Sequence, residues 1–351
     1  MPVVRTIDRP LASAPGPRHV LAAAACGVTR FIAAEGGDAG RVLEGAGLAA
    51  ERMADPLLPL DLGAYCTMME LAAADTGDLN FGLRFGQQFE PEQLGLIGRI
   101  ALTAPTLGAA LQSFAGLFPF HQQVTETRFA GDGAQLRLEY RILDGRIVER
   151  RQDAELTMGM FANVLRRCLG ADWAPDEVQF EHPQPDDARE HRAAFGAPAR
   201  FGQRSNALLF RCRELQRPMP QRDAAAFVAL REELLQVAGG TGELAFIDRV
   251  RGEVRSRLSS GYPHVDDIAA ALGLARWTLQ RRLAEHGCRY AELVDDLRRA
   301  LAVRYLGERH LPVGDIAALL GYSEISAFTR AFVRWFGAAP SRLRARQAAL
   351  I

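Results

Sequence analysis

A short segment near the carboxyl end carries side chains that could recognise DNA bases. Leu279 and Leu283 lie four residues apart, so on a helix both would point into the core. The remaining faces would then carry Arg276, Trp277, Thr278, Gln280 and Arg281. Glutamine can form two hydrogen bonds with adenine, arginine two with guanine, and an aromatic ring can pack on the thymine methyl group. Each good pair gives about 1 to 3 kcal/mol of discrimination between bases.

Ordinary structural interpretations of the same residues remain open. Trp277 could be a core or hinge aromatic, because a tryptophan that faces solvent is uncommon. The arginines could form a solvated helix face without a partner. The sequence alone does not decide between these interpretations and base recognition.

The pattern around this segment occurs twice, and the copies are 48 to 49 residues apart. Each copy has an apolar pair on a first helix, a glycine turn, and a second helix with a buried apolar stripe, which is the order of a helix-turn-helix motif. The first copy has Ile268-Ala269, Leu272-Gly273, Leu279, Arg281 and Leu283, and the second has Ile316-Ala317, Leu320-Gly321, Phe328, Arg330 and Phe332.

The second helix of the second copy also leaves residues for DNA. We expect Ser323 to be its N-cap and Glu324 to begin it, whereas Ala275 stands at the matching place in the first copy. The first copy would therefore lack a side-chain cap, at a cost of about 1 kcal/mol. The positions left for bases and phosphates are Ile325, Ser326, Thr329, Arg330 and Val333.

One amphipathic helix is predicted between the copies, from Tyr290 to Leu306 and ending at Gly307. At about 1.5 Å per residue it would be about 26 Å long. Successive major grooves lie about 34 Å apart, so this helix is a rigid spacer of suitable scale. Residues 244–351 are thus predicted to form an all-α domain in which a linker helix joins two helix-turn-helix motifs.

The upstream region is predicted to be an α+β domain over residues 19–238. Short helices are expected up to residue 88, with further helices over 105–118, 154–169, 186–195 and 222–237. Alternating residues predict a small antiparallel sheet with strands at 125–129, 135–140, 178–182 and 207–212, the first two joined by a turn at 131–133. The proline-rich residues 1–18 are expected to be a disordered leader, and the glycine-rich residues 239–243 a linker.

Charge is distributed unevenly between the two regions. The chain of 351 residues has no net charge, but residues 241–351 contain 17 Arg against 12 Asp and Glu, which gives +5 there and −5 elsewhere. The basic end is the one that contains the repeat, as expected for a nucleic-acid partner. Lysine is absent from the sequence, which excludes a P-loop.

The sequence offers no metal, cofactor or membrane signal. The five cysteines are far apart and form no C-x-x-C pair, so neither a zinc site nor a disulfide framework is indicated. No apolar run approaches the roughly 18 residues of a membrane span, and the run from Val20 to Cys26 is too short for a signal peptide. We therefore expect a cytoplasmic protein.

Catalysis also lacks candidate residues. The G-x-G-x-x-A pattern from Gly45 to Ala50 follows a helical segment and lacks the acidic residue that a dinucleotide site needs about 20 residues later. Neither G-x-S-x-G nor H-E-x-x-H occurs. In the upstream domain, His121 and His182 could touch an effector and Phe114, Phe118 and Phe120 could line a pocket, although a structural role is commoner for such residues. The effector-binding residues remain unknown from the sequence.

The carboxyl-terminal region resembles the AraC/XylS family of bacterial transcription regulators over about His264 to Arg344. The resemblance lies in Asp267–Leu274, Thr278–Leu283, Gly321–Phe332, Arg334–Gly337 and Pro340. It implies a regulator, usually an activator, that binds double-stranded promoter DNA and contacts RNA polymerase. By motif position it implies DNA contacts from Trp277, Gln280 and Arg281 in the first motif and from Ile325, Ser326, Thr329 and Arg330 in the second.

Residues from about His19 to Pro220 resemble the effector domain of the ornithine/arginine-regulator branch of that family. The matching segments are Leu94–Gly98, Ala104–Leu111, Phe180–Pro183 and Phe195–Pro198. This resemblance implies a small-molecule sensor that also forms a homodimer. The helix-rich pattern argues against the β-barrel effector domain of the arabinose regulator itself.

Two other functions remain as hypotheses. The upstream domain could be an enzyme that the DNA-binding module tethers to DNA, in which case a reactive thiol among Cys26, Cys66, Cys168 and Cys212 is the best candidate nucleophile. Alternatively, the protein could bind DNA constitutively, without any effector.

Overall fold

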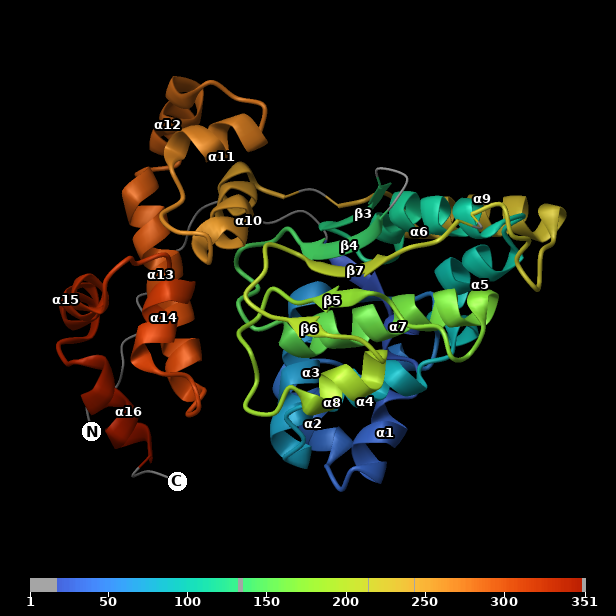
Figure 1. Cartoon of the computed structure of the whole chain (residues 1–351), viewed down its shortest axis with the longest axis horizontal. Helices are drawn as coiled ribbons and strands as arrows, with labels where there is room; N and C mark the ends of the chain where they lie inside the picture. The colour runs from blue at the N-terminus through green and yellow to red at the C-terminus, as the bar shows by residue number, and fades with distance from the viewer. Residues whose placement is uncertain (1–17, 132–134, 214, 243, 349–351) are drawn as a thin grey trace.

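A computed structural model describes residues 18–131, 135–213, 215–242 and 244–348. The expected leader lies outside these residues except for Arg18, as do most of the turn at 131–133 and part of the 239–243 linker. Two hydrophobic cores are present, one formed by residues before Phe246 and one formed by residues after it. The fold class predicted from the sequence, an α+β part followed by an all-α part, is confirmed (Figure 1).

The N-terminal part begins with short helices, as predicted, but also contains a two-stranded sheet that was not predicted. Strands β1 (His19–Leu21) and β2 (Pro59–Asp61) pair antiparallel. Each has three residues and its partner lies far away in the sequence, so no local alternation reveals the pair. The helices here are η1 (Ala22–Ala25), α1 (Val28–Ala34), α2 (Ala39–Ala46), η2 (Ala50–Met53), α3 (Leu62–Thr76), α4 (Phe81–Gln88), η3 (Pro91–Leu94), α5 (Gly95–Thr103) and α6 (Leu107–His121).

A five-stranded sheet follows, with the order β3-β4-β7-β5-β6. The strands are β3 (Thr125–Gly131), β4 (Leu136–Ile142), β5 (Glu177–Gln179), β6 (Ala199–Arg200) and β7 (Asn206–Phe210). The predicted hairpin is confirmed. The predicted strand at 178–182 is shorter, and the pairing of β5 with the unpredicted β6 is parallel. Among the described strands, β3 and β6 form free edges, so the sheet is open, as the helix-rich pattern indicated.

Three more helices complete this part. They are α7 (Arg151–Leu169), α8 (Arg189–Phe195) and α9 (Ala224–Ala238). Helix α7 packs against β4 and β7, and α6 packs against β3. Nearly every residue of α7 is buried, including the polar residues Asp153 and Glu155, so it forms the centre of this part of the molecule.

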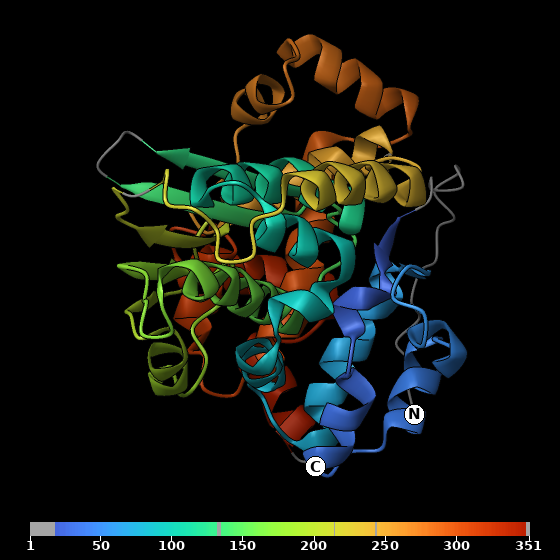
Figure 2. The same cartoon turned by 90° about the vertical axis from the view of Figure 1, so that its right-hand side faces the viewer.

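The C-terminal part consists of helices α10 (Phe246–Leu258), α11 (Val265–Ala271), α12 (Arg276–Glu285), α13 (Tyr290–Gly307), α14 (Val313–Leu319), α15 (Ile325–Phe336) and α16 (Pro340–Ala348). The two helix-turn-helix motifs are α11–α12 and α14–α15. Helix α13 lies between them as the predicted linker. In both views, α11 and α12 project away from the N-terminal part (Figures 1 and 2).

The prediction for the start of α15 was wrong by one residue. Glu324 is the N-cap and has an extended backbone, with φ −135° and ψ 137°, so it cannot belong to the first turn. Its carboxylate accepts a hydrogen bond from Ser326 Oγ. Within the described residues, α12 and α15 alike lack a side-chain cap, so the expected difference in capping between the two motifs does not exist.

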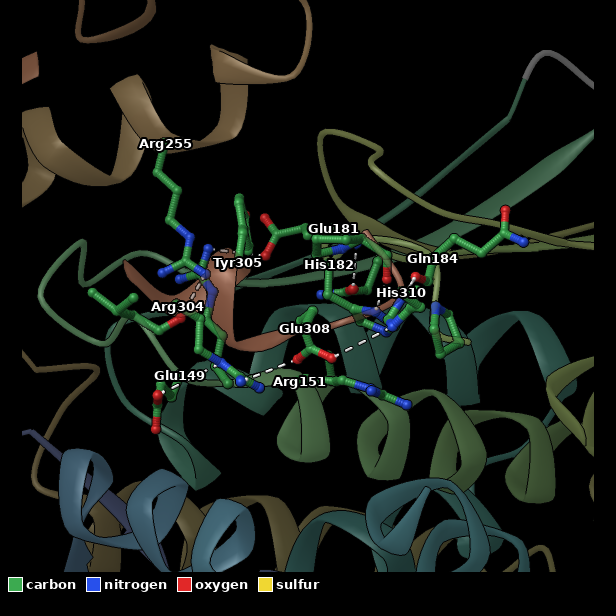
Figure 3. A pocket seen from close by; sticks show the side chains of 16 residues that line it. Glu149, Arg151, Glu181, His182, Gln184, Arg255, Arg304, Tyr305, Glu308 and His310 are labelled. Atoms are coloured by element: carbon green, nitrogen blue, oxygen red, sulfur yellow. Dashed lines mark hydrogen bonds and ion pairs between the residues drawn. The ribbon is translucent and has the colours of Figure 1, made fainter. Parts of the chain in front are cut away.

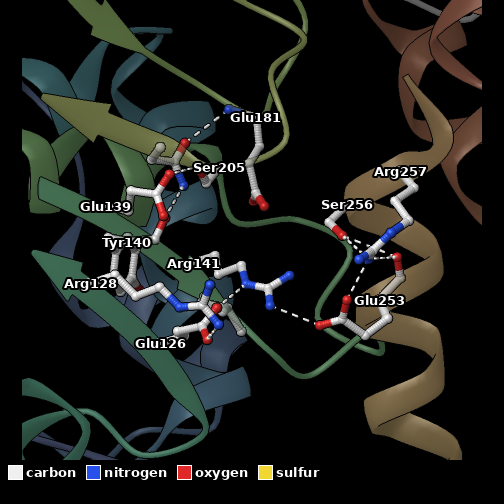
Figure 4. Close-up of polar contacts among 12 residues, drawn as sticks. Glu126, Arg128, Glu139, Tyr140, Arg141, Glu181, Ser205, Glu253, Ser256 and Arg257 are labelled. Atoms are coloured by element: carbon white, nitrogen blue, oxygen red, sulfur yellow. Dashed lines mark hydrogen bonds and ion pairs between the residues drawn. The ribbon is translucent and has the colours of Figure 1, made fainter. Parts of the chain in front are cut away.

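Polar contacts join the two parts along α10. Arg141 of β4 pairs with Glu253 at 2.8 Å (Figure 4). Arg255 donates to the carbonyl oxygens of Ile147 and Val148 at 2.7 and 2.8 Å. The parts are therefore joined mainly by charged side chains at this seam. No helix in the described ranges is both long enough and apolar enough to span a membrane.

Candidate nucleic-acid interface

The first helix-turn-helix motif presents the predicted side chains on its outer surface. Leu279 and Leu283 are buried in the core, as the four-residue spacing predicted. Trp277 is 64% exposed, so the alternative of a core aromatic is wrong. The exposed residues also include Arg276, Gln280 and Arg281, and Thr278 is half-buried.

Neighbouring side chains contact two of the arginines of α12. The Arg281 guanidinium lies over the Trp277 ring, 5.4 Å from its centre, and 3.8 Å from the Glu285 carboxylate. Arg276 bonds to Asp266 at 3.1 Å. Because these pairs are exposed, each contributes little to stability, and a phosphate or a guanine could replace the carboxylate at low cost.

The second motif presents a more apolar outer surface. Phe328 and Phe332 form the buried stripe of α15. Ile325 is 54% exposed and Val333 42% exposed. The polar candidates are Ser326 and Arg330, which are exposed, and Thr329, which is half-buried. All ten residues that the sequence left for DNA are thus at least partly accessible, and their contact with DNA stays a prediction.

Arg298 holds the turn of the second motif, a role that the sequence analysis did not predict. Its guanidinium is buried, donates to the carbonyl oxygens of Leu320 and Gly321 at 2.7 and 2.9 Å, and lies 4.1 Å from the centre of the Tyr322 ring. In the first motif, the phenol of Tyr290 donates to the Pro263 carbonyl at 2.7 Å instead. An arginine within a helix gives no local signal of burial, so only the packing reveals it.

The other candidate residues of the N-terminal part lie in the core or at the end of a helix. Phe114 and Phe118 are core residues that pack edge-on against Phe161. His121 is fully buried, and burial lowers its pKa to about 3. Gly45 to Ala50 forms the end of α2 and the following turn, which is not the strand-to-helix turn of a dinucleotide site.

His182, in contrast, lines a small cavity between the two parts of the molecule (Figure 3). The cavity is lined by residues of both parts, with Arg150, Arg151 and Glu181 on one side and Arg255, Arg304 and His310 on the other. Burial, and then the charge of Arg150, lower the pKa of Arg255 to about 10. Three glutamates also line the cavity: Glu181 pairs with Arg150, and Glu149 and Glu308 pair with Arg304. The sequence singled out only His182 among these residues, because the others come together from distant segments.

The two exposed recognition helices on a shared linker helix define a DNA-binding regulator with two helix-turn-helix motifs. Comparison with known proteins agrees with this class. Residues 36–219 match the family model for the arabinose-binding N-terminal domain of the AraC transcription regulator. Residues 268–346 match the model of a helix-turn-helix domain. The chain belongs to the AraC family of transcriptional regulators.

Two relatives match most of the chain. The HTH-type transcriptional regulator VirS of Mycobacterium tuberculosis is 31% identical over 82% of this chain and 84% of its own length. The ornithine utilization regulator of Pseudomonas aeruginosa is 29% identical over 78% of this chain and 80% of its own length. These matches agree with the ornithine-regulator-like branch suggested by the sequence. A crystal structure of the regulator CdpR of Pseudomonas aeruginosa covers 88% of this chain and 96% of its own, with 20% identity and a TM-score of 0.40.

Proposed function

We propose that this regulator binds promoter DNA by inserting α12 and α15 into successive major grooves. The observation that carries the proposal is the pair of accessible recognition helices at the two ends of α13. That helix has 18 residues and is therefore about 27 Å long. The contacts would come from Arg276, Trp277, Thr278, Gln280 and Arg281 in the first motif and Ile325, Ser326, Thr329 and Arg330 in the second.

The N-terminal part, residues 19–238, would serve as the effector domain, and residues 239–243 as the linker to the DNA-binding domain. An effector that bound at the cavity between the parts would contact both of them, so it could change their relative position directly. An acidic group on the effector could replace one of the glutamates that now pair with Arg150 and Arg304. Constitutive binding without an effector is the alternative, and it would be favoured if no acidic metabolite raised the melting temperature.

Homodimerisation through α9 is a further part of the proposal. Val228 and Leu235 of this helix are seven residues apart, so they lie on one face, and they are 53% and 43% exposed. A second copy could cover these side chains. DNA binding by a dimer would double the number of motifs on one operator and increase specificity.

The remaining parts of the proposal follow from the family. Activation through contact with RNA polymerase is proposed as the outcome of DNA binding, in the cytoplasm where bacterial DNA lies. Relatives are named as transcriptional regulators, and we propose that this chain likewise acts without catalysing a reaction. Uniformly inert thiols at Cys26, Cys66, Cys168 and Cys212 would remove the best candidate nucleophile of the enzyme alternative.

Selection of binding sites from random DNA by the full chain tests the central proposal. We expect enrichment of a site with two recognition elements about one helical turn apart. Affinity should fall steeply with salt, since each neutralised phosphate adds about 0.9 to the slope of log affinity against log salt. Failure to enrich any sequence would refute the proposal.

A further inference from the structure

Three side chains that are distant in the sequence meet beside the cavity between the two parts. Glu155 comes from α7, His182 follows β5, and His191 comes from α8. One ligand atom of each lies within 4.8 Å of the others. His191 Nε2 is 2.7 Å from Glu155 Oε1, and His182 Nε2 is 3.3 Å from the same oxygen.

The hydrogen bond of His182 fixes which of its ring nitrogens carries the proton. Nδ1 lies 2.9 Å from the Pro183 carbonyl oxygen, which can only accept, so Nδ1 must be the N–H. In a neutral ring that carries its proton on Nδ1, Nε2 has a lone pair. The Nε2 lone pair then faces the oxygens of Glu155, and this nitrogen has no hydrogen-bond partner among the described residues.

Glu155 is paired with Arg151 in this position. Arg151 donates to Oε1 at 2.8 Å. The other oxygen, Oε2, is buried and accepts no hydrogen bond within the described ranges. His182 Nε2 and Glu155 Oε2 are therefore two buried acceptors without a donor among the described residues, and a cation bound between them would satisfy both.

The surroundings would keep such a site rigid and dry. Phe180 and Phe201 lie against both imidazoles, with ring centres 5.0 to 5.6 Å apart. Arg151 is itself held by Asn80 Oδ1 at 2.7 Å, and it fixes the orientation of the carboxylate. Ligating histidines commonly donate their second ring N–H to a backbone carbonyl, as His182 does here, and an apolar shell excludes competing water.

We propose that Glu155, His182 and His191 bind a divalent transition-metal ion of the Zn²⁺ type. Two imidazoles and one carboxylate are the ligand set of three-residue zinc sites, which leave further coordination positions to water or to a ligand. His191 must present Nε2 as a lone pair, so its proton moves to Nδ1, which lacks a partner among the described residues. That cost and the nearby charge of Arg151 make the site weaker than a fully ordered structural zinc site.

The position of the site gives the ion a route to the DNA-binding part. His182 belongs to the segment that lines the cavity, where His310, which follows α13, hydrogen-bonds to the Gln184 carbonyl at 2.7 Å (Figure 3). An ion on His182 would fix this segment and, through it, the contact with the end of α13. The inference concerns a metal and is independent of the organic effector proposed above.

Metal titration of the full chain tests the proposal. The chain is first stripped of metal with a chelator. Zn²⁺ is then titrated into it in competition with a chromophoric chelator. In a separate titration, binding of Co²⁺ is followed by its visible absorption. We expect one ion per chain and a Co²⁺ spectrum of nitrogen and oxygen ligation. Glu155→Gln and His182→Gln should each weaken Zn²⁺ binding by more than the roughly 10- to 100-fold typical of losing an outer partner. His121→Gln, which replaces a buried histidine elsewhere, should leave binding unchanged.

Several results would overturn the proposal. These are absence of stoichiometric binding, Zn²⁺ affinity unchanged in both cluster variants, or a Co²⁺ charge-transfer band typical of thiolate ligands. If the variants do not fold, NMR of the unaltered chain decides, because Zn²⁺ should change the ring-nitrogen shifts of only two of its seven histidines. Shifts of none, or of many, would contradict the site. Because no DNA takes part, a negative result does not affect the proposed DNA binding.

Discussion

The two helix-turn-helix motifs share a sequence pattern but are embedded differently. A Cβ atom added to Gly321 would clash with the Gly261 carbonyl and lie 2.8 Å from that of Leu258, whereas one added to Gly273 would meet no described atom within 4 Å. Among the described residues, Arg298 donates hydrogen bonds to the second turn and none to the first. The turn of the second motif is therefore packed against the end of α10, whereas the turn of the first motif is open.

The outer surfaces of the two motifs also differ in which side chains they expose. The first motif exposes Trp277, Gln280 and Arg281, which can form directional contacts with bases. The second exposes Ile325 and Val333, which offer only apolar contacts, beside the polar residues Ser326 and Arg330. The difference suggests a division in which the more firmly held motif positions the protein on DNA and the more loosely held one supplies most of the hydrogen-bonding specificity.

Replacing each of the two turn glycines with alanine should give the largest difference in stability loss between the motifs. Both have positive φ, +67° for Gly273 and +73° for Gly321, so each variant incurs about 1 to 2 kcal/mol of backbone strain. Gly321→Ala adds the clash, for a total of about 2 to 5 kcal/mol. Hydrogen exchange of the amides of α14 and α15, compared with those of α11 and α12, would measure both. Equal effects would refute the difference in embedding.

Arg298→Ala should have the second largest effect, a loss of about 3 kcal/mol in the local stability of the second motif. It removes charged hydrogen bonds and leaves two carbonyl oxygens with one partner fewer. Arg299→Ala is the matched control, because Arg299 is exposed and only stacks on Phe336, a contact of about 0.5 to 1 kcal/mol. Similar hydrogen-exchange changes for the two variants would argue against the role given to Arg298.

Each motif presents one exposed arginine on its recognition helix, so base recognition should depend on both motifs. We expect Arg281→Ala and Arg330→Ala each to cost about 1 to 3 kcal/mol of DNA affinity and to relax specificity at one position of the operator. Arg282→Ala should change affinity less, since its guanidinium stacks on Phe246, 5.5 Å from the ring centre. Affinities for single-base operator variants would measure this. A uniform loss across all sequences would assign the arginine to a phosphate instead.

Capping the first motif should give the smallest effect. Ala275 has an extended backbone, with φ −72° and ψ 147°, and precedes α12 without a side-chain cap in the described structure. Ala275→Ser should stabilise α12 by about 0.5 to 1 kcal/mol, whereas Ala275→Val, which has no oxygen, should not. Slower amide exchange at the start of α12 in the serine variant alone is the expected result. Equal exchange in both variants would show that another group already satisfies these amides.

Local periodicity accounts for the features that the sequence predicted well. The spacing of Leu279 and Leu283, repeated in Phe328 and Phe332, specified two recognition helices and therefore which side chains face outward. The apolar positions from Tyr290 to Tyr305 likewise specified the linker helix. These features depend on residues within a few turns of one another, so the order of the residues is sufficient to determine them.

The tertiary structure alone decided the features that join distant segments. The pairing of β1 with β2, the burial of Arg298 beneath Tyr322, the cavity between the two parts and the meeting of Glu155 with His182 and His191 all depend on how helices and strands pack. A histidine or arginine has the same local pattern whether it faces solvent or a carboxylate. The burial and charged partners that give such residues a role exist only after folding, and the linear sequence therefore could not reveal them.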